Sequence, residues 1–103
     1  MNAYTKILGN GVVGNAIYST NATDIGIKLA GDLDGGTVSL FEWYGDGTPD
    51  LAGSEWELFA TITAASVGSD GIRYTIGMDT SWYAAVTGAG SPDAYFKVWD
   101  ILR

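Results

Sequence analysis

The segment TVSLFEWYGDGTPDLAGSEWELFATIT, residues 37–63, decides the fold class. Its two arms alternate apolar and polar side chains, which is typical of β-strands with one buried face. Between the arms, residues 45–54 contain Pro49 and three glycines, a composition typical of surface turns. The segment therefore predicts two neighbouring strands joined by a ten-residue loop.

The same pattern extends along the rest of the chain. Alternating runs occupy residues 24–33, 72–78, 81–88 and 94–102, and weaker ones occupy 3–8 and 12–20. The Asp-Gly-Gly at 34–36 indicates a tight turn. Because no helix-length segment separates the runs, parallel βαβ units are excluded. We expect an all-β single domain, an antiparallel β-sandwich or jelly roll of about seven or eight short strands. Residues 21–103 would form the sandwich, and residues 1–20 an N-terminal arm or edge strands.

Composition narrows the range of functions. The 103 residues suffice for one domain, and the absence of Cys and His removes disulfides, thiolate metal sites and the commonest general base. The net charge is −7 and the five basic residues are scattered, so we expect no nucleic-acid partner. No apolar run approaches about 20 residues, and the first residues do not resemble a secretory signal, so we expect no membrane association.

Both faces of the run at 37–44 are partly apolar. Val38, Leu40, Glu42 and Tyr44 alternate with Phe41 and Trp43. One of the two sets must point away from the local core, and apolar surface of that kind marks contacts with partners. We therefore take Phe41, Trp43 and Tyr44 as candidate partner-binding residues. On the following run, simple alternation places Trp56, Leu58, Ala60 and Ile62 on one face and Glu55, Glu57, Phe59 and Thr61 on the other.

The N-terminal residues supply two further candidates. An exposed N-terminal strand can add to the sheet edge of a neighbouring molecule, although a frayed terminus has the same composition. The first run contains the large side chains Tyr4 and Ile7, and we include these two among the candidate partner-binding residues.

Catalytic and metal sites are weakly indicated. Glu42 and Glu57 have the residue type of a glycosidase acid/base pair, but a solvated strand face explains them more simply. Residues 32–35 read Asp-Leu-Asp-Gly, the beginning of a calcium loop, but the twelfth position from Asp32 is Trp43 and not Glu. We predict no enzyme activity, no metal and no cofactor.

Residues 31–102 resemble the small all-β virion proteins of tailed bacteriophages. The resemblance rests on a Gly-Gly before a Thr-Val-x-Leu strand, an acidic Gly turn, a Trp-containing strand and a Tyr-x-x-Val-Thr-Gly strand. Here these elements are Gly35, Gly36, Thr37, Val38, Leu40, Asp46, Gly47, Trp56, Tyr83, Val86, Thr87 and Gly88. The turn at 45–54 departs from the family pattern because it is longer and carries Pro49.

The resemblance implies a capsid decoration (cement) protein, or a head or tail accessory protein, with no catalytic residues. Such a protein would bind the major capsid protein or another virion protein, form a homotrimer, and reside in the virion after assembly in the host cytoplasm. A carbohydrate-binding β-sandwich module used for host attachment remains an alternative, since sugar rings stack on exposed aromatic side chains.

Overall fold

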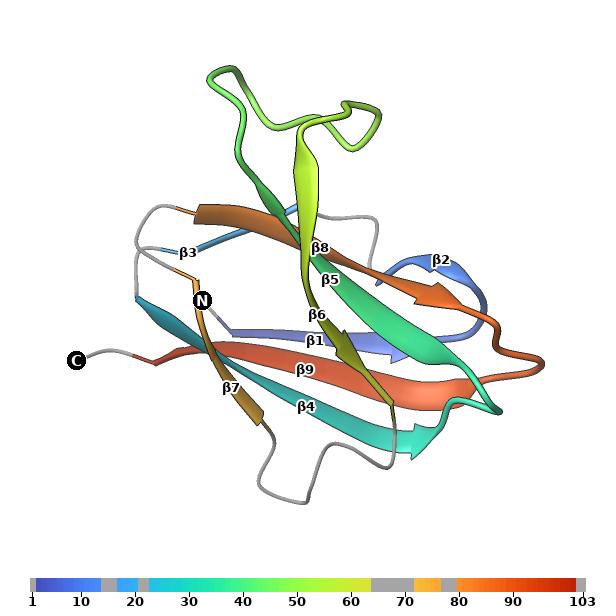
Figure 1. The fold of residues 1–103 in the computed structure, drawn as a ribbon. Coiled ribbons are helices and arrows are strands. Elements are labelled where there is room, and N and C mark those ends of the chain that lie inside the picture. The colour runs from blue at the N-terminus through green and yellow to red at the C-terminus, as the bar shows by residue number, and fades with distance from the viewer. Residues whose placement is uncertain (1, 14–16, 21–22, 64–71, 77–79, 102–103) are drawn as a thin grey trace.

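A computed structural model describes residues 2–13, 17–20, 23–63, 72–76 and 80–101 of the chain. The described residues form nine strands in two antiparallel sheets that pack face to face as a β-sandwich (Figure 1). The expected all-β class and single sandwich domain are confirmed. The strands are β1 (Asn2–Ile7), β2 (Gly11–Val12), β3 (Tyr18–Thr20), β4 (Asp24–Asp32), β5 (Thr37–Trp43), β6 (Trp56–Ile62), β7 (Ile72–Thr75), β8 (Thr80–Thr87) and β9 (Asp93–Ile101).

Sheet A contains four strands in the order β1-β9-β4-β7, and sheet B contains β2-β8-β5-β6 with β3 also paired to β8. Residues 12–20, expected as one strand, contribute to β2 and β3, which lie along the same edge of β8. The N-terminal residues are therefore built into both sheets: β1 forms an edge of sheet A, and β2 and β3 extend sheet B.

The core lies between the sheets and follows the two-residue period of the strands. On β4 the buried side chains are Ile25, Ile27 and Leu29, and on β9 they are Phe96 and Val98. Sheet B contributes Val38, Leu40, Ile62, Trp82, Ala84 and Val86. The parity of the last strand, which alternation alone left ambiguous, follows from this: Phe96 and Val98 face inward, while Tyr95, Lys97 and Trp99 alternate with them and face outward.

The Asp-Gly-Gly turn connects the two sheets. Asp34 and Gly35 both have positive φ, 49° and 82°, and the amide of Gly36 donates to the carbonyl of Leu33 at 3.0 Å. These are features of a tight two-residue turn. Because β4 belongs to sheet A and β5 to sheet B, the turn forms a corner of the sandwich, not a paired hairpin.

A tryptophan covers a glycine on the outer face of sheet A. Gly26 on β4 lies directly opposite Trp99 on β9, and a Cβ at Gly26 would lie 2.1 Å from Cε2 of the Trp99 indole. The ring thus occupies the space that a side chain would take. The sequence requires glycine here because the indole packs on the bare backbone of the neighbouring strand.

The same sheet contains a buried acid. Asp24 at the start of β4 is 0% exposed, and it is paired with Arg73 of β7, whose side chain is 53% exposed. The guanidinium therefore compensates a carboxylate that is removed from water. This pair links the edge strand β7 to the centre of sheet A.

We expect Gly26→Ala to lower the free energy of unfolding by about 2 kcal/mol, because the new methyl group displaces the Trp99 indole. Urea unfolding followed by tryptophan fluorescence measures the change. The matched control is Gly9→Ala, where a Cβ meets nothing within 4 Å and the change should stay within about 0.5 kcal/mol. Equal effects of the two substitutions would contradict this packing.

We expect Arg73→Gln to destabilise the fold by about 2 kcal/mol, since it leaves the buried carboxylate of Asp24 without its cation. Lys6→Gln is the comparison, because it removes the cation of an ion pair with Asp93 whose side chains are 43% and 75% exposed. Because water screens that exposed pair, its loss should change the free energy of unfolding little. Chemical denaturation of both variants at one protein concentration measures the two losses in the free energy of unfolding. A loss for Arg73→Gln no larger than that for Lys6→Gln would contradict the role of the buried pair.

Candidate functional site

A cluster of aromatic side chains covers the outer face of sheet B, on the side opposite the core. It contains Phe41 and Trp43 of β5, Trp56 and Leu58 of β6, and Tyr83 of β8, and we call these five residues the aromatic surface. The four rings form a continuous row. Phe41 stacks on Tyr83 with centroids 4.9 Å apart, Tyr83 meets Trp56 at 4.7 Å, and Trp56 meets Trp43 at 4.9 Å.

A β-bulge creates this surface. Between Leu40 and Phe41 the pairing with β6 shifts: Leu40 lies opposite Ala60, but Phe41 lies opposite Leu58. Phe59 is the extra residue. It packs against the core together with Ala60 and meets Tyr74 edge-on at 5.9 Å. An extra residue reverses the alternation beyond it. Residues of β6 that would share a face in a regular strand therefore lie on opposite faces when they stand on opposite sides of the bulge.

The bulge corrects one expectation from the sequence. Simple alternation placed Trp56 and Leu58 on the same face as Ala60 and Ile62. That prediction is wrong, because Trp56 pairs with Trp43 and Leu58 with Phe41 on the outer face, while Ile62 is 1% exposed in the core. The outer face of sheet B is therefore more apolar than alternation implied. Leu58 is 53% exposed on it.

The two tryptophans also hold the 44–55 loop in place. The indole N–H of Trp43 donates to the carbonyl of Gly47 at 3.1 Å, and that of Trp56 donates to the carbonyl of Asp50 at 2.8 Å. The amide of Tyr44 donates to the carbonyl of Glu55 at 3.0 Å and closes the base of the loop. In Figure 1 this loop and the adjoining ends of β5 and β6 project beyond the rest of the sandwich. The rings thus support a projecting hairpin instead of filling the core.

Tyr44 borders the aromatic surface. It is 61% exposed, and together with Trp56, Glu57 and Leu58 it lines an open depression of about 480 Å³. Phe41, Trp43 and Tyr44, the candidates from the sequence, therefore lie close together on the projecting hairpin. The analysis of the sequence missed Trp56, Leu58 and Tyr83, which join them only through the bulge and through long-range pairing with β8.

The two N-terminal candidates lie elsewhere. Ile7 is 3% exposed and belongs to the core, so its side chain is not part of a surface of this chain. Tyr4 pairs with Lys97 on sheet A, the sheet opposite the aromatic surface, and its side chain lies outside the described part of the structure.

Two glutamates face each other at the base of the hairpin. Glu42 and Glu57 are direct cross-strand partners, and Glu42 also lies opposite the buried Trp82. Burial raises the pKa of Glu42, and the negative charge of Glu57 raises that pKa further. Like charges at directly opposed positions destabilise a sheet, so the pair does not contribute to the stability of the isolated chain.

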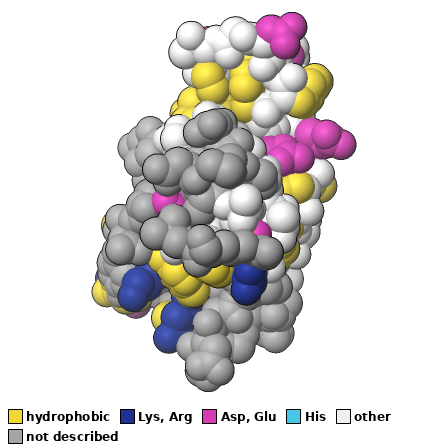
Figure 2. Space-filling model, turned by 90° about the vertical axis from the view of Figure 1, so that its left-hand side faces the viewer, with side chains coloured by type: hydrophobic (Ala, Val, Ile, Leu, Met, Phe, Trp, Pro, Cys, Tyr) yellow, Lys and Arg dark blue, Asp and Glu magenta, His cyan; other side chains and the backbone are white. Residues whose placement is uncertain are grey.

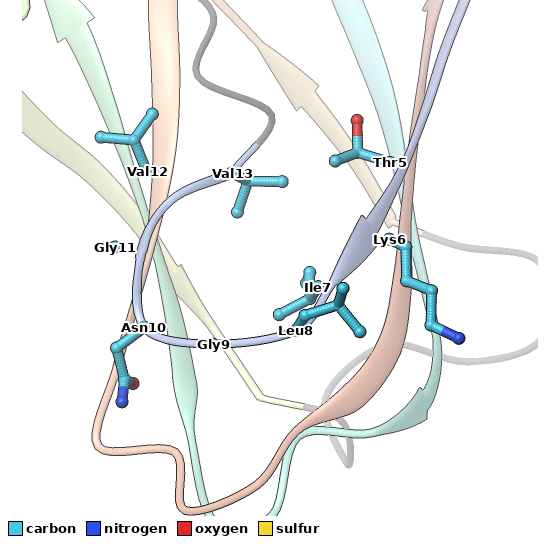
Figure 3. A pocket seen from close by; sticks show the side chains of 9 residues that line it. All are labelled: Thr5, Lys6, Ile7, Leu8, Gly9, Asn10, Gly11, Val12 and Val13. Atoms are coloured by element: carbon cyan, nitrogen blue, oxygen red, sulfur yellow. The ribbon is translucent and has the colours of Figure 1, made fainter.

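A second hollow, of about 260 Å³, lies inside the turn from β1 to β2 (Figure 3). Its lining is the single segment 5–13, which contains neither a carboxylate nor an aromatic ring. Asn10 fixes this turn, because its side-chain amide exchanges two 2.9 Å hydrogen bonds with the backbone of Ala89. The hollow therefore has few groups that could recognise a ligand.

The acids of residues 32–34 serve local structure. The Asp32 carboxylate accepts from the amide of Asp34 at 2.8 Å, and the Asp34 carboxylate accepts from the amide of Ser91 at 2.7 Å. Within the described ranges, no group of three or more acidic side chains is placed to hold a metal ion. Nor does that part of the chain contain a helix long and apolar enough to cross a membrane.

Comparison of the chain with models of known protein families, with curated proteins and with solved structures finds no match. We therefore infer the function from the aromatic surface and from the charges around it.

We expect Glu42→Gln to raise the free energy of unfolding at pH 7 by a few tenths to about 1 kcal/mol. The raised pKa means that the folded state binds its proton more tightly than the unfolded state. Ionised Glu42 therefore costs stability above the folded pKa, and this cost disappears below the ordinary glutamate pKa of 4.5. Urea unfolding of the wild type and the variant at pH 7 and at about pH 3.5 measures the difference in stability with Glu42 ionised and with Glu42 protonated. A variant that is less stable than the wild type at pH 7 would contradict the repulsion.

Proposed function

We propose that this protein is a structural component of a tailed-phage virion, a capsid decoration protein that binds the major capsid protein through the aromatic surface. It acts by protein–protein contact, without catalysis and without a cofactor. The observation that carries the proposal is the row of half-buried rings on the outer face of a sheet whose inner face already supplies the core.

β5 has more apolar side chains than the core can bury. Val38 and Leu40 fill the core side of β5 with 0% exposure, so Phe41 and Trp43 on its other side have no core to join. Trp and Tyr are the residues that most often dominate the binding energy of protein interfaces. Leu58, 53% exposed, adds an apolar contact at the edge of the row. Covering these side chains with a partner removes apolar area from water and favours association.

The surroundings of the aromatic surface suit a protein partner. The 44–55 loop beside the aromatic surface contains three exposed acids, Asp46, Asp50 and Glu55, and no base. They give the apolar surface a charged border, the usual anatomy of an interface. The indole hydrogen bonds to Gly47 and Asp50 hold the loop before binding, and a preorganised surface loses less entropy on association. The assembly proposed from the family resemblance is a homotrimer in the virion, put together in the host cytoplasm.

Carbohydrate binding is the second candidate. The depression between Tyr44 and Trp56 favours it, because two of its four lining residues are aromatic. The ring geometry argues against it: Trp43 and Trp56 are inclined at 65°, and Trp56 and Tyr83 at 89°. Phe41 and Tyr83 are nearly parallel at 20°, but they stack on each other. A platform for consecutive sugar rings needs coplanar rings that lie side by side, so a protein partner is the better fit.

Leu58→Asp should weaken the binding of the protein to empty capsid shells of its phage by at least about thirtyfold, since it places a charge within the apolar contact. Cosedimentation of purified protein with shells measures the affinity. Leu8→Asp is the matched control, because Leu8 is also exposed, at 73%, but lies on the turn after β1, away from the aromatic surface.

Wild-type protein that does not cosediment with the shells would remove the decoration function. Equal loss in both leucine variants would remove the aromatic surface as the contact. A glycan array probed with the same proteins tests the second candidate, which requires binding by the wild type and its loss in Trp56→Ala.

A further inference from the structure

The basic residues of the described part of the chain lie on one sheet, while acids occur on both sheets and in the loops. Every described basic residue lies on a strand of sheet A: Lys6 on β1, Lys28 on β4, Arg73 on β7 and Lys97 on β9. The strands of sheet B and the 44–55 loop contain no Lys or Arg. Figure 2 shows one side of the molecule: the Lys and Arg side chains lie in the lower half, and none lies on the projecting hairpin, where Asp and Glu side chains are prominent.

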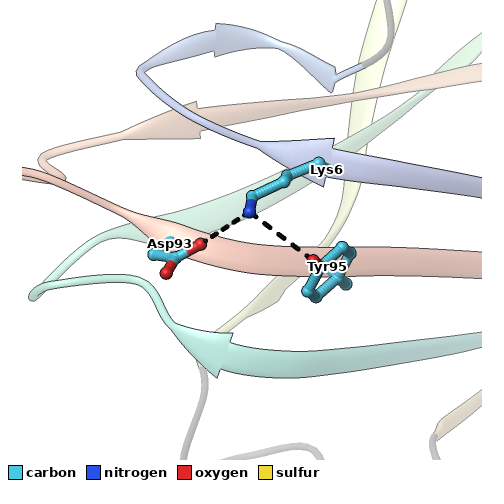
Figure 4. Close-up of polar contacts among 3 residues, drawn as sticks. All are labelled: Lys6, Asp93 and Tyr95. Carbon is cyan, nitrogen blue, oxygen red and sulfur yellow. Dashed lines mark hydrogen bonds and ion pairs between the residues drawn. The ribbon is translucent and has the colours of Figure 1, made fainter.

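Two of the four cations already have an acidic partner on sheet A. Arg73 is paired with the buried Asp24. The ammonium of Lys6 lies 3.1 Å from the Asp93 carboxylate and donates to the hydroxyl of Tyr95 at 3.5 Å (Figure 4). The hydrogen bond to Asp93, followed by that to Tyr95, raises the pKa of Lys6. These two charges are compensated within the chain.

Lys28 and Lys97 are different. They are direct cross-strand partners on β4 and β9, the two central strands of sheet A. They alternate with the buried Ile27 and Val98 and so face outward. Neither forms an ion pair with another residue in the described ranges. Two like charges in directly opposed positions repel each other, so an acidic group that approaches both would stabilise the sheet.

The opposite arrangement occurs at the base of the projecting hairpin. Glu42 and Glu57 are also direct cross-strand partners, on β5 and β6. In both pairs the Cβ atoms are separated by the cross-strand distance of roughly 5 Å, so one pair matches the other in spacing and is opposite in sign. Because the two pairs lie on different sheets, they cannot meet within one molecule, but they can meet between two.

We propose that the outer face of sheet A binds the acidic hairpin of a second copy of this chain, with Lys28 and Lys97 opposite Glu42 and Glu57. The exposed Asp46 and Glu55 add to the attraction. The contact joins two different surfaces, so it propagates around a closed ring or along an open chain. A ring that closes after three copies is the homotrimer of the proposed function. The inference rests on that proposal only for the copy number.

A nucleic acid is the alternative occupant of a basic face. It fits less well, because the described part of sheet A offers only two cations without an ion pair, whereas a nucleic acid presents negative charge along its whole length to a chain of net charge −7. Long-range repulsion therefore opposes a polyanion. The second copy is also negative overall, but it brings Glu42 and Glu57 together on one projecting hairpin. Its aromatic surface, on the other face of β5 and β6, stays available for the capsid shell.

Light scattering of the full chain at several concentrations, in low and high salt, tests the contact. The wild type should have a mass above the 10.8 kDa monomer and should dissociate toward it in high salt. Lys28→Gln with Lys97→Gln should weaken association at least about tenfold. Thr61→Glu with Thr87→Glu changes the net charge by the same −2 at two exposed positions and is the matched control, which should associate as the wild type does.

A second experiment exchanges the charges of the two surfaces. The double variants Lys28→Glu/Lys97→Glu and Asp46→Lys/Glu57→Lys should each be monomeric, and an equimolar mixture should associate again. Rescue requires two folded partners with complementary charges, so association of the mixture cannot come from a misfolded variant, and the mixture is evaluated with both variants folded. Circular dichroism of each variant records its fold.

Three results would overturn the inference: a monomeric wild type at every concentration, a wild-type mass for Lys28→Gln/Lys97→Gln, or no association in the charge-exchange mixture. A monomeric wild type would also rule out the proposed trimer in solution. A wild-type mass for Lys28→Gln/Lys97→Gln would instead mean that the copies associate through a different interface. Shell cosedimentation separates the two proposals, because the lysine variant keeps its aromatic surface and should still bind shells. Wild-type protein that associates but does not bind shells would end the decoration function alone.

Discussion

The structure depends on the packing of Trp82 between the two sheets. Its indole is 0% exposed, stacks on Tyr18 of β3 at 4.6 Å and meets Phe96 of sheet A at 6.4 Å. It therefore joins the N-terminal segment, the centre of sheet B and the opposite sheet at one point. A small sandwich has few large side chains with which to fill its core. Here one tryptophan is committed to the interior, and the other three remain outside it.

Those three tryptophans show how the molecule uses side chains that its core does not need. Trp99 lies on the bare backbone of Gly26 and covers the outer face of sheet A. Trp43 and Trp56 support the 44–55 loop through their indole N–H groups. One β-bulge, at Phe59, turns Trp56 and Leu58 to the same face as Phe41 and Trp43. The bulge thus converts two ordinary strands into an apolar surface, and the loop beyond it into a supported projection.

Much of the fold was predictable from the sequence because strand alternation and turn chemistry are local. The runs that became β4, β5, β6, β8 and β9 were recognised, and so was the tight turn at Asp34 and Gly35. Two-sided apolar character on β5 also identified Phe41 and Trp43. The bulge at Phe59 had no such local sign: Leu58, Phe59 and Ala60 are consecutive apolar residues, but so are residues 82–86 of β8, which alternate without a register shift.

What the sequence did not reveal depends on contacts between distant segments. Tyr83 joins the aromatic surface because β8 pairs with β5, and periodicity does not specify which strands pair. Ile7 looked like part of an exposed arm, but β1 pairs with β9, and its inward side chain completes the core. The opposed pair Lys28–Lys97 likewise arises from register. Glu42 and Glu57 were considered together for their residue type, but that they face each other also follows from register. In sequence these four residues are separate charges on alternating strands.

We propose that the outer face of sheet B is a contact surface and not incidental apolar exposure. Hydroxyl-radical footprinting of the protein, free and bound to capsid shells, tests this most directly, because it reports the solvent access of individual side chains. If this face binds the shell, Trp43, Tyr44 and Leu58 should be strongly protected on binding, while Leu8 stays as reactive as in the free protein. Unchanged reactivity of the three residues in the bound state, with protection elsewhere, would contradict it.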